Sequence, residues 1–461
     1  MNYNEFLNSK ADYGADSGFE PLWMPDFLFD FQQFFLNRSI RRGRAADFAD
    51  CGLGKSVMEL VFAQNCIQKT NKPSLLLTPL AVTGQMLEEA RKFGIEARRA
   101  VPGENHKTIQ VINYEQLHKF NPLDYGGVIC DESSILKSYS GTRRKQITEF
   151  MRHSIYGLLA TATASPNSWN ELGTSSEALG YLGHRDMESR FFKRQQVFAK
   201  TSRGRQKEFQ LLHWAEKGPF WQWVASWATA ARKPSDLGPF SDEKFNLPEL
   251  IEKDILVKAR NSTPGMLFDM EAVGFHEIRE AQRRTIQERC EKAAEIVAQL
   301  DGAILVWCNL NQEGNLLEKL IPGAVQVAGR HSDEHKINSA YWFKHGTDSK
   351  RVLISKPKIF GWGMDWSQVE AMTVFPTFSY EAYYQQVRRA HRFGRKTPLT
   401  VYRVYTDGGI RMLDAIKVKS KKADRMFDRL VQYMNQAVHI ENPYKPMEVE
   451  LPKWMQNGRN K

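Results

Sequence analysis

The segment Ala49-Asp50-Cys51-Gly52-Leu53-Gly54-Lys55-Ser56 follows a short apolar run and precedes an apolar stretch that is predicted to be helical from Val57. Its two glycines let backbone N–H groups face an anion without a Cβ in the way, and the helix N-terminus adds positive potential. In this setting Lys55 is expected to reach the β and γ phosphates of a nucleotide, and Ser56 to ligate Mg²⁺. A glycine-rich turn before an ordinary helix is the alternative. The predicted nucleotide contacts in this segment are Gly52, Leu53, Gly54, Lys55 and Ser56.

Short apolar runs alternate with longer amphipathic stretches along most of the chain, a pattern typical of strands and helices around a buried parallel sheet. In the first half these runs are Ala45–Ala49, Leu75–Thr78, Thr108–Ile112, Gly126–Cys130 and Ile155–Ala160. In the second half they are Ile255–Val257, Ala303–Trp307, Ala324–Val327, Val352–Ser355, Ala371–Phe375 and Leu399–Tyr405. The predicted fold class is therefore α/β, with two halves of similar size.

The stretch between the two halves differs in composition. Residues 168–231 are rich in Trp, Phe, Lys and Arg and are predicted to form a helical insertion, and Lys233–Pro248, with three prolines, is the best linker candidate. Long helices are expected over His276–Leu300 and Gly409–Asn435. We expect one domain at residues 1–240, a second at 241–438, and an irregular tail at 439–461.

The overall charge favours a polyanionic partner. The 461 residues include 64 Lys and Arg against 53 Asp and Glu, a net charge of +11. The five cysteines are scattered without a C-x-x-C pair, which indicates reduced thiols and a cytoplasmic location. The richest apolar stretch, Phe220–Ala231, is too short to cross a bilayer, and Met1–Lys10 lacks the apolar core of a secretory signal.

Two carboxylates, Asp131 and Glu132, directly follow the apolar run Gly126–Cys130. In an open α/β sheet ligands bind at the carboxyl ends of strands, so this pair should lie beside the loop at Lys55. Asp131 could then hold the Mg²⁺ shell, while Glu132 orients and deprotonates an attacking water. Two solvated loop acids are the alternative.

The segment Gln385–Arg395 is dense in guanidinium groups. Arg389 and Arg392 are three residues apart, so one helical face could carry both. Aimed at a γ-phosphate from across a cleft, they would stabilise charge in the transition state. A solvated basic helix or a simple nucleic-acid contact patch is the alternative.

In their order along the chain these signatures resemble the Swi/Snf-type branch of the superfamily 2 (DEAD/DEAH-box) helicases and translocases, from about Leu28 to about Leu430. The family's nucleotide loop is similar to Phe48–Ser56, and there too Ala commonly takes the first place. The chain departs from the family at Ser133-Ser134, where Ala-His is usual, and at Ala164, where Pro is usual. The other similar segments are Leu28–Gln32, Thr78–Leu80, Ile112–Glu115, Asp131–Glu132 with Lys137, Ala160–Ala164, Gly361–Trp366 and Gln385–Arg392.

The resemblance implies two RecA-like lobes with parallel sheets, an ATP cleft between them, and nucleic acid lying across both. It gives Arg389 and Arg392 the role of arginine fingers and Gln385 a coupling role, and it identifies Lys55, Asp131 and Glu132 as catalytic. The further nucleotide contacts that it implies are Gln32, which would recognise adenine, Gly363 and Asp365.

The predicted function is an ATP- and Mg²⁺-dependent helicase or translocase that moves along DNA without sequence specificity. An RNA helicase and a non-hydrolysing nucleic-acid-binding scaffold are the alternatives, and intact Lys55, Glu132 and Arg389 argue against the scaffold. The Trp residues at 214, 221, 223 and 227 could stack on bases, but their spacing favours a packed core. Basic clusters that could contact phosphates are Arg41, Arg42 and Arg44; Arg143–Lys145; Arg203, Arg205 and Lys207; and Lys417, Lys419, Lys421 and Lys422.

Overall fold

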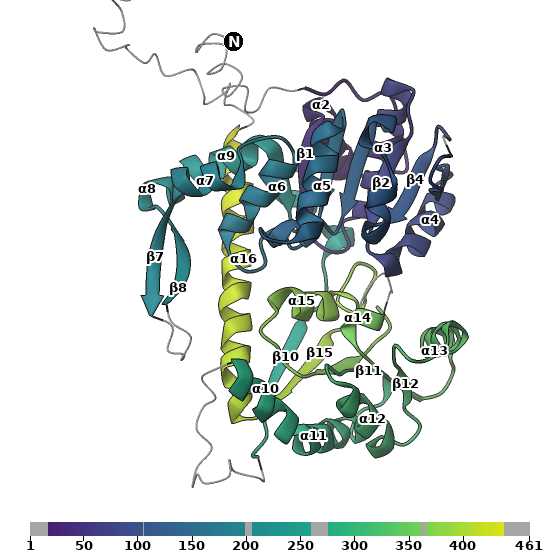
Figure 1. The fold of residues 1–461 in the computed structure, drawn as a ribbon. Coiled ribbons are helices and arrows are strands. Elements are labelled where there is room, and N and C mark those ends of the chain that lie inside the picture. The colour runs from purple at the N-terminus through teal and green to yellow at the C-terminus, as the bar shows by residue number, and fades with distance from the viewer. Residues whose placement is uncertain (1–16, 105, 199–204, 260–274, 361–365, 438–461) are drawn as a thin grey trace, which may run out of the picture.

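The computed structural model describes residues 17–104, 106–198, 205–259, 275–360 and 366–437. Two parallel sheets form two lobes, which lie one above the other in Figure 1. The first lobe is built on seven strands in the order β3-β4-β2-β5-β6-β1-β9, and every neighbouring pair is parallel. These strands are β1 (Arg44–Ala49), β2 (Ser74–Thr78), β3 (Ala97–Arg99), β4 (Ile109–Asn113), β5 (Gly127–Asp131), β6 (Tyr156–Ala160) and β9 (Ala228–Ala231).

The second lobe is built on six parallel strands in the order β10-β15-β14-β11-β13-β12. The predicted fold class of two α/β halves is confirmed, and each predicted apolar run overlaps a strand. These strands are β10 (Leu250–Leu256), β11 (Gly302–Trp307), β12 (Val325–Val327), β13 (Lys350–Ser355), β14 (Ala371–Val374) and β15 (Leu399–Tyr405).

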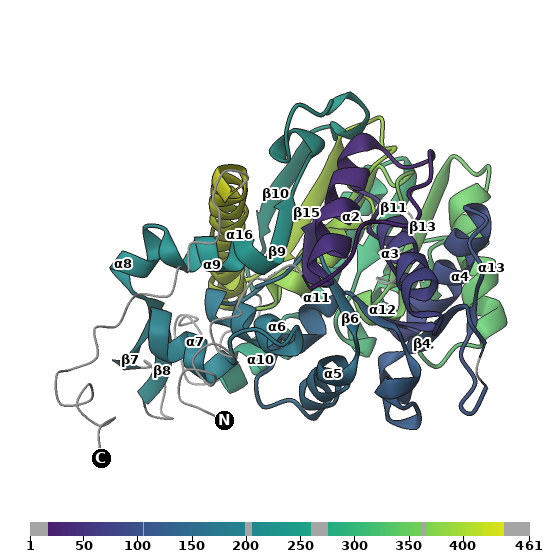
Figure 2. The ribbon, with the colours of Figure 1, turned by 90° about the horizontal axis from the view of Figure 1, so that it is seen from above.

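Helices pack on the faces of both sheets (Figure 2). On the first lobe they are α2 (Asp30–Arg42), α3 (Lys55–Thr70), α4 (Thr83–Lys92), α5 (Thr142–His153), α6 (Leu172–Ala178), α7 (His184–Phe191), α8 (His213–Glu216) and α9 (Pro219–Trp227). On the second they are α10 (Phe275–Arg284), α11 (Ile286–Ala298), α12 (Asn311–Leu320), α13 (Asp333–His345), α14 (Pro357–Phe360), α15 (Tyr380–Arg388) and α16 (Ile410–Ala437). None of these helices combines the length and the apolar character that a membrane span requires.

The insertion after β6 is not wholly helical, contrary to expectation. It contains the antiparallel hairpin of β7 (Phe192–Phe198) and β8 (Arg205–Leu211), and it ends in β9, which adds a seventh strand to the first sheet. Strand β9 reads Ala-Thr-Ala-Ala and carries no large apolar residue, so its strand character comes from pairing with β1 rather than from side-chain pattern. In Figure 1 the hairpin stands apart from both sheets.

Two long helices were expected in the second half, and one of them is divided. The stretch expected as a single helix from His276 splits at Thr285 into α10 and α11. The Thr285 hydroxyl donates to the Ala281 carbonyl at 2.8 Å, a local bond of the kind that bends helices. Helix α16 is continuous over 28 residues and runs past both lobes (Figure 1).

The last turns of α16 join the core of the first lobe. Met426, Phe427, Leu430, Tyr433 and Met434 are all buried in that core, against α9 and β9. The helix therefore starts on the second lobe and ends on the first, which ties the two together beyond the linker. The boundary near residue 240 stays a prediction.

Candidate active site

The loop between β1 and α3 has the backbone that an anion cradle needs. Gly52 and Gly54 have φ values of 93° and 78°, a region that L-residues with a Cβ rarely adopt. A Cβ on Gly54 would also clash with the amide of Gln32, which donates from Nε2 to the Leu53 carbonyl at 2.9 Å. Lys55 Nζ donates to the carbonyls of Ala49 and Asp50, at 2.9 and 3.2 Å. The ammonium group therefore lies over the loop, where a phosphate could take the place of these carbonyls.

Of the predicted acidic pair, Asp131 ends β5 and Glu132 directly follows it, two strands away from β1 in the first sheet. Glu132 has φ 52° and ψ 51°, a left-handed conformation that costs a residue with a side chain about 1 kcal/mol or more. Burial raises the pKa of Asp131 to about 7, the adjacent Glu132 raises it too, and Lys55 and Arg389 act in the opposite direction. A cation bound beside Asp131 would favour the ionised form of this buried carboxylate.

Glu132 is held from both lobes. Its Oε2 accepts from the Thr161 hydroxyl at 3.3 Å, and its Oε1 accepts from Gln385 Nε2 of α15 at 3.2 Å. Gln385 Oε1 in turn accepts from the Arg389 guanidinium at 3.2 Å. The Glu132, Thr161 and Gln385 side chains are buried, whereas Arg389 is half-buried and its Nε has no hydrogen-bond partner. A chain of hydrogen bonds thus links the expected base to the expected arginine finger.

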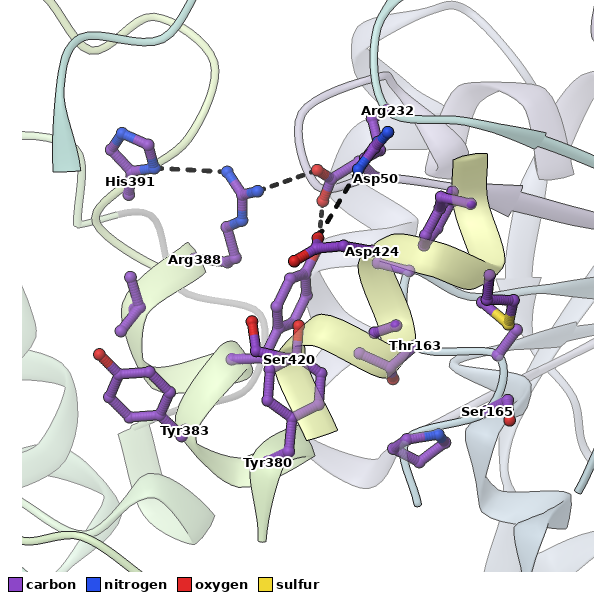
Figure 3. Close-up of a pocket in the computed structure, with 18 of the residues that line it drawn as sticks. Asp50, Thr163, Ser165, Arg232, Tyr380, Tyr383, Arg388, His391, Ser420 and Asp424 are labelled. Atoms are coloured by element: carbon purple, nitrogen blue, oxygen red, sulfur yellow. Dashed lines mark hydrogen bonds and ion pairs between the residues drawn. The ribbon is translucent and has the colours of Figure 1, made fainter. Parts of the chain in front are cut away.

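A second contact between the lobes lies at Asp50, within the phosphate loop. Its Oδ2 forms an ion pair with Arg388 at 2.9 Å, and its Oδ1 accepts from the Tyr384 hydroxyl (Figure 3). Burial raises the pKa of Tyr384 well above its usual value, and Asp50 adds to the shift, so the hydroxyl remains a donor. His391 Nε2 lies 2.7 Å from the Pro248 carbonyl and its Nδ1 lies 3.3 Å from Arg388. Because burial lowers the pKa of His391, we assign a neutral ring that donates to Pro248 and accepts from Arg388.

These groups border a cavity of about 210 Å³ between the lobes. Figure 3 shows it bounded by α15 on one side, by α16 on another and by the loop after β6. Asp424 of α16 and Arg232, which follows β9, approach each other to 3.6 Å at its rim. The cavity is thus closed by elements from both lobes.

A third contact between the lobes involves Ser134, one of the two serines that stand where the helicases resembled by the sequence usually have Ala-His. Ser134 donates to Glu381 Oε1 at 2.7 Å, and Lys137 forms an ion pair with the same carboxylate. Glu381 lies in the first turn of α15, one turn before Gln385. The segment that lacks the usual His is therefore still in contact with the second lobe.

Aromatic rings cover the phosphate loop on another side. A Cβ on Gly52 would lie 2.9 Å from Phe393 Cβ, so these two residues touch across the lobes. The Phe393 ring is 5.1 Å from that of Phe245, which is 5.2 Å from that of Phe29, next to Gln32. Phe393 remains 40% exposed and could stack on a planar ligand.

Several solved structures are similar in fold. S. cerevisiae Dbp5 bound to RNA and ADP BeF3 matches 87% of this chain and 93% of its own, with a TM-score of 0.50 and 11% identity. The L327V variant of Dbp5 with the same ligands matches 91% of this chain and 100% of its own, also with a TM-score of 0.50 and 11% identity. The Sulfolobus solfataricus SWI2/SNF2 ATPase core in complex with dsDNA matches 92% of this chain and 97% of its own, with a TM-score of 0.40 and 14% identity. The chain therefore shares the fold of the two Dbp5 structures. Neither a family model nor a curated protein matches the sequence.

Most of the predicted site residues lie together at the facing edges of the two lobes. Lys55, Asp131, Glu132 and Arg389 interact electrostatically, and Gly52, Gly54 and Gln32 shape the loop beside them. Ser56 and Arg392 are half-buried, and Leu53 is buried. The predicted contacts Gly363 and Asp365 lie outside the described residues.

Sequence reasoning missed the residues that hold the two lobes together at this site. Tyr384, Arg388 and Glu381 contact the first lobe, as does Phe393. A signal was present in the spacing, because residues 381, 384, 385 and 388 fall on one face of a helix. The sequence does not show which face of this helix points toward the first lobe, because that depends on how the second lobe is oriented relative to the first.

The side chains fit ATP and Mg²⁺ as ligands. No group of three His, Cys, Asp or Glu residues that could hold a metal exists among the described residues. Mg²⁺ typically takes one or two protein ligands and completes its shell with phosphates and water. Ser56 and Asp131 would supply such ligands, and the Arg389 guanidinium, whose Nε has no hydrogen-bond partner, would supply positive charge to the phosphates.

The other aromatic and basic candidates divide into core and surface. Trp221, Trp223 and Trp227 are buried, as the favoured interpretation expected, whereas Trp214 is 48% exposed. Arg44 is not a surface contact: its guanidinium donates to the carbonyls of Leu179, Ser154 and Met151 at 2.6 to 2.7 Å. Lys421 and Lys422 are exposed.

Proposed function

We propose that this chain is a nucleic-acid-dependent ATPase that uses hydrolysis to move along DNA without sequence specificity. The observation that carries the proposal is the chain of hydrogen bonds from Glu132 through Gln385 to Arg389, which spans both lobes beside the phosphate loop. A protein that only bound nucleic acid would have no need of a buried acid and a half-buried arginine facing one phosphate loop. The likeness of fold to Dbp5, which was solved bound to RNA and ADP BeF3, supports this proposal.

The roles of the residues follow from their positions. Lys55 and the N–H groups of the loop would bind the β and γ phosphates, and Ser56 and Asp131 would hold Mg²⁺, which neutralises phosphate charge. Glu132 would accept a proton from the attacking water, because its carboxylate is fixed by Thr161 and Gln385. Arg389 would stabilise the charge that develops on the γ-phosphate.

Movement would come from coupling between the lobes. Asp50, Glu132 and Glu381 each make a contact that joins the two lobes at the edge where the nucleotide would bind. Nucleotide binding and release would change these contacts, and the lobes would close and open in turn. Nucleic acid lying across both lobes would bias that equilibrium only through contacts that differ between the two states.

The test is steady-state ATP hydrolysis with no nucleic acid, single-stranded DNA, duplex DNA and RNA. We expect DNA of any sequence to raise the rate at least about tenfold, with less stimulation at higher salt because phosphate contacts release counterions. Lys55→Ala is the control, and it should abolish hydrolysis while nucleic-acid binding persists. Equal rates for the wild type and Lys55→Ala would overturn the ATPase assignment, and stimulation by RNA alone would replace DNA as the track.

A further inference from the structure

A groove of about 430 Å³ lies between the β7–β8 hairpin and α16, away from the phosphate loop. The wall that α16 contributes consists of Val418, Lys421, Lys422 and Arg425. Their spacing of three, four and seven residues places them on one face of the helix. Val418 is 53% exposed, and both lysines are exposed as well. This wall is therefore an apolar and cationic stripe open to solvent.

The hairpin wall is aromatic. Phe192 pairs with Leu211 and Arg194 pairs with Phe209 across the two strands, so these four residues share one face of the hairpin. Phe192, Phe209 and Leu211 line the groove. The exposed Arg194 lies over the Phe209 ring at 5.6 Å.

Trp169, which follows the loop after β6, also lines the groove. Its ring meets the edge of Trp221 at 5.1 Å, and the Arg425 guanidinium lies 5.8 Å from its centre. The ring is only partly buried, so part of it is open to solvent. Glu216 is the one acid among the described lining residues, and it is paired with Arg425 at 2.5 Å.

We infer that this groove binds a single strand of nucleic acid, an inference that rests on the proposed function. Lys421 and Lys422 would neutralise backbone phosphates, while Phe209 and Trp169 offer rings for base stacking. An apolar helix of a partner would bury the two lysines without a counter-charge, which is costly. An acidic peptide would satisfy the lysines and leave the aromatic wall without a role.

The groove is connected to the candidate active site by one short loop. At its start the Thr161 hydroxyl donates to Glu132, and at its end Trp169 Nε1 donates to the Lys422 carbonyl at 3.3 Å. Between them, Asn167 accepts from Lys419 of α16 at 2.9 Å. A strand held against Trp169 and α16 would therefore restrain the loop that positions Glu132. Occupancy of the groove should raise the hydrolysis rate.

The experiment measures binding of a fluorescein-labelled oligothymidylate by anisotropy at several salt concentrations. For Lys421→Glu/Lys422→Glu we expect affinity to fall at least about tenfold and the slope of log K against log salt to become shallower by about 1.4. The matched control is Arg283→Glu/Lys319→Glu, which makes the same charge change at exposed positions on α10 and α12 of the second lobe. Hydrolysis without nucleic acid should be the same in all three proteins.

Two further measurements separate the possible outcomes. Phe209→Ala keeps the charge and should still weaken binding, by about 5- to 150-fold if one base stacks on the ring. Polyglutamate should compete poorly with the oligonucleotide. Equal loss in the control double variant, unchanged binding in the groove variants, or full competition by polyglutamate would overturn the inference. Those results would leave the proposed function standing as long as the wild type hydrolyses ATP and Lys55→Ala does not.

Discussion

Arg388 of the second lobe and Asp50 of the phosphate loop form an ion pair of 2.9 Å in which both side chains are mostly buried. Neither residue belongs to the lysine, glycines and serine that make up the phosphate-binding pattern. The pair fixes the loop directly to α15, the helix that also carries Gln385. A change in lobe orientation must therefore break or shift a contact of the loop itself.

We predict that this pair contributes to catalysis through the position of the loop. Arg388→Gln and Asp50→Asn should each lower kcat/KM for ATP, and the double variant should lose less than the sum. A coupling free energy of about 1 to 2 kcal/mol is expected for two groups in direct contact. The measurement is a double-mutant cycle on kcat/KM. Strictly additive effects would show that the two residues act independently.

Glu132→Gln should bind ATP and hydrolyse it slowly. The amide keeps the size of the side chain and can still accept from Thr161, but it cannot take a proton from water, so kcat should fall about 10²-fold or more. ATP affinity, measured by equilibrium binding, should hold or increase. A normal rate in this variant would remove Glu132 from the mechanism.

Arg389→Ala and Arg392→Ala should each lower kcat with little change in ATP affinity, because a finger acts on the transition state. Arg389 hydrogen-bonds to Gln385, which in turn holds Glu132. The decrease in kcat should therefore be larger for Arg389→Ala than for Arg392→Ala and should reach at least about 10²-fold. Single-turnover hydrolysis and oligonucleotide binding are measured on the same preparations. Weaker nucleic-acid binding with unaltered hydrolysis would make either arginine a backbone contact instead.

Asp47 of β1 should make stability depend on pH. Its Oδ1 accepts from Ser39 at 2.7 Å and its Oδ2 has no partner. Burial raises the pKa of Asp47 from 3.8 to about 7, whereas the Ser39 hydrogen bond acts in the opposite direction. The folded state holds the proton more tightly than the unfolded state. The contribution of Asp47 to stability is therefore greatest below about pH 4, declines as the pH rises to about 7, and is constant above.

Asp47→Asn cannot ionise, so it should be more stable than the wild type at pH 8, by on the order of 2 kcal/mol, and the advantage should shrink at pH 5. Urea unfolding at both pH values measures the difference. Asp26→Asn, at an exposed position, is the control and should change little at either pH. An advantage that did not depend on pH would mean that Asp47 keeps its charge state on folding.

The sequence by itself determined the α/β class and most of the strands, because a strand buried on both faces must be a nearly unbroken apolar run. It also determined the phosphate loop, since a positive φ at Gly52 and Gly54 and a lysine at the helix start can be recognised locally. Strand β9 and the β7–β8 hairpin could not be predicted from the sequence. Their residues carry no such pattern, and pairing with β1 or across the hairpin decides their conformation.

The tertiary structure alone decided how the two lobes meet. Asp50 and Arg388, Ser134 and Glu381, and Glu132 and Gln385 are each separated by more than two hundred residues. A charge in a sequence has no partner until the chain is folded, because Coulomb attraction acts over a few ångströms in space and not along the chain. The same holds for the groove, where Trp169 and Lys422 come together only because α16 returns to the first lobe.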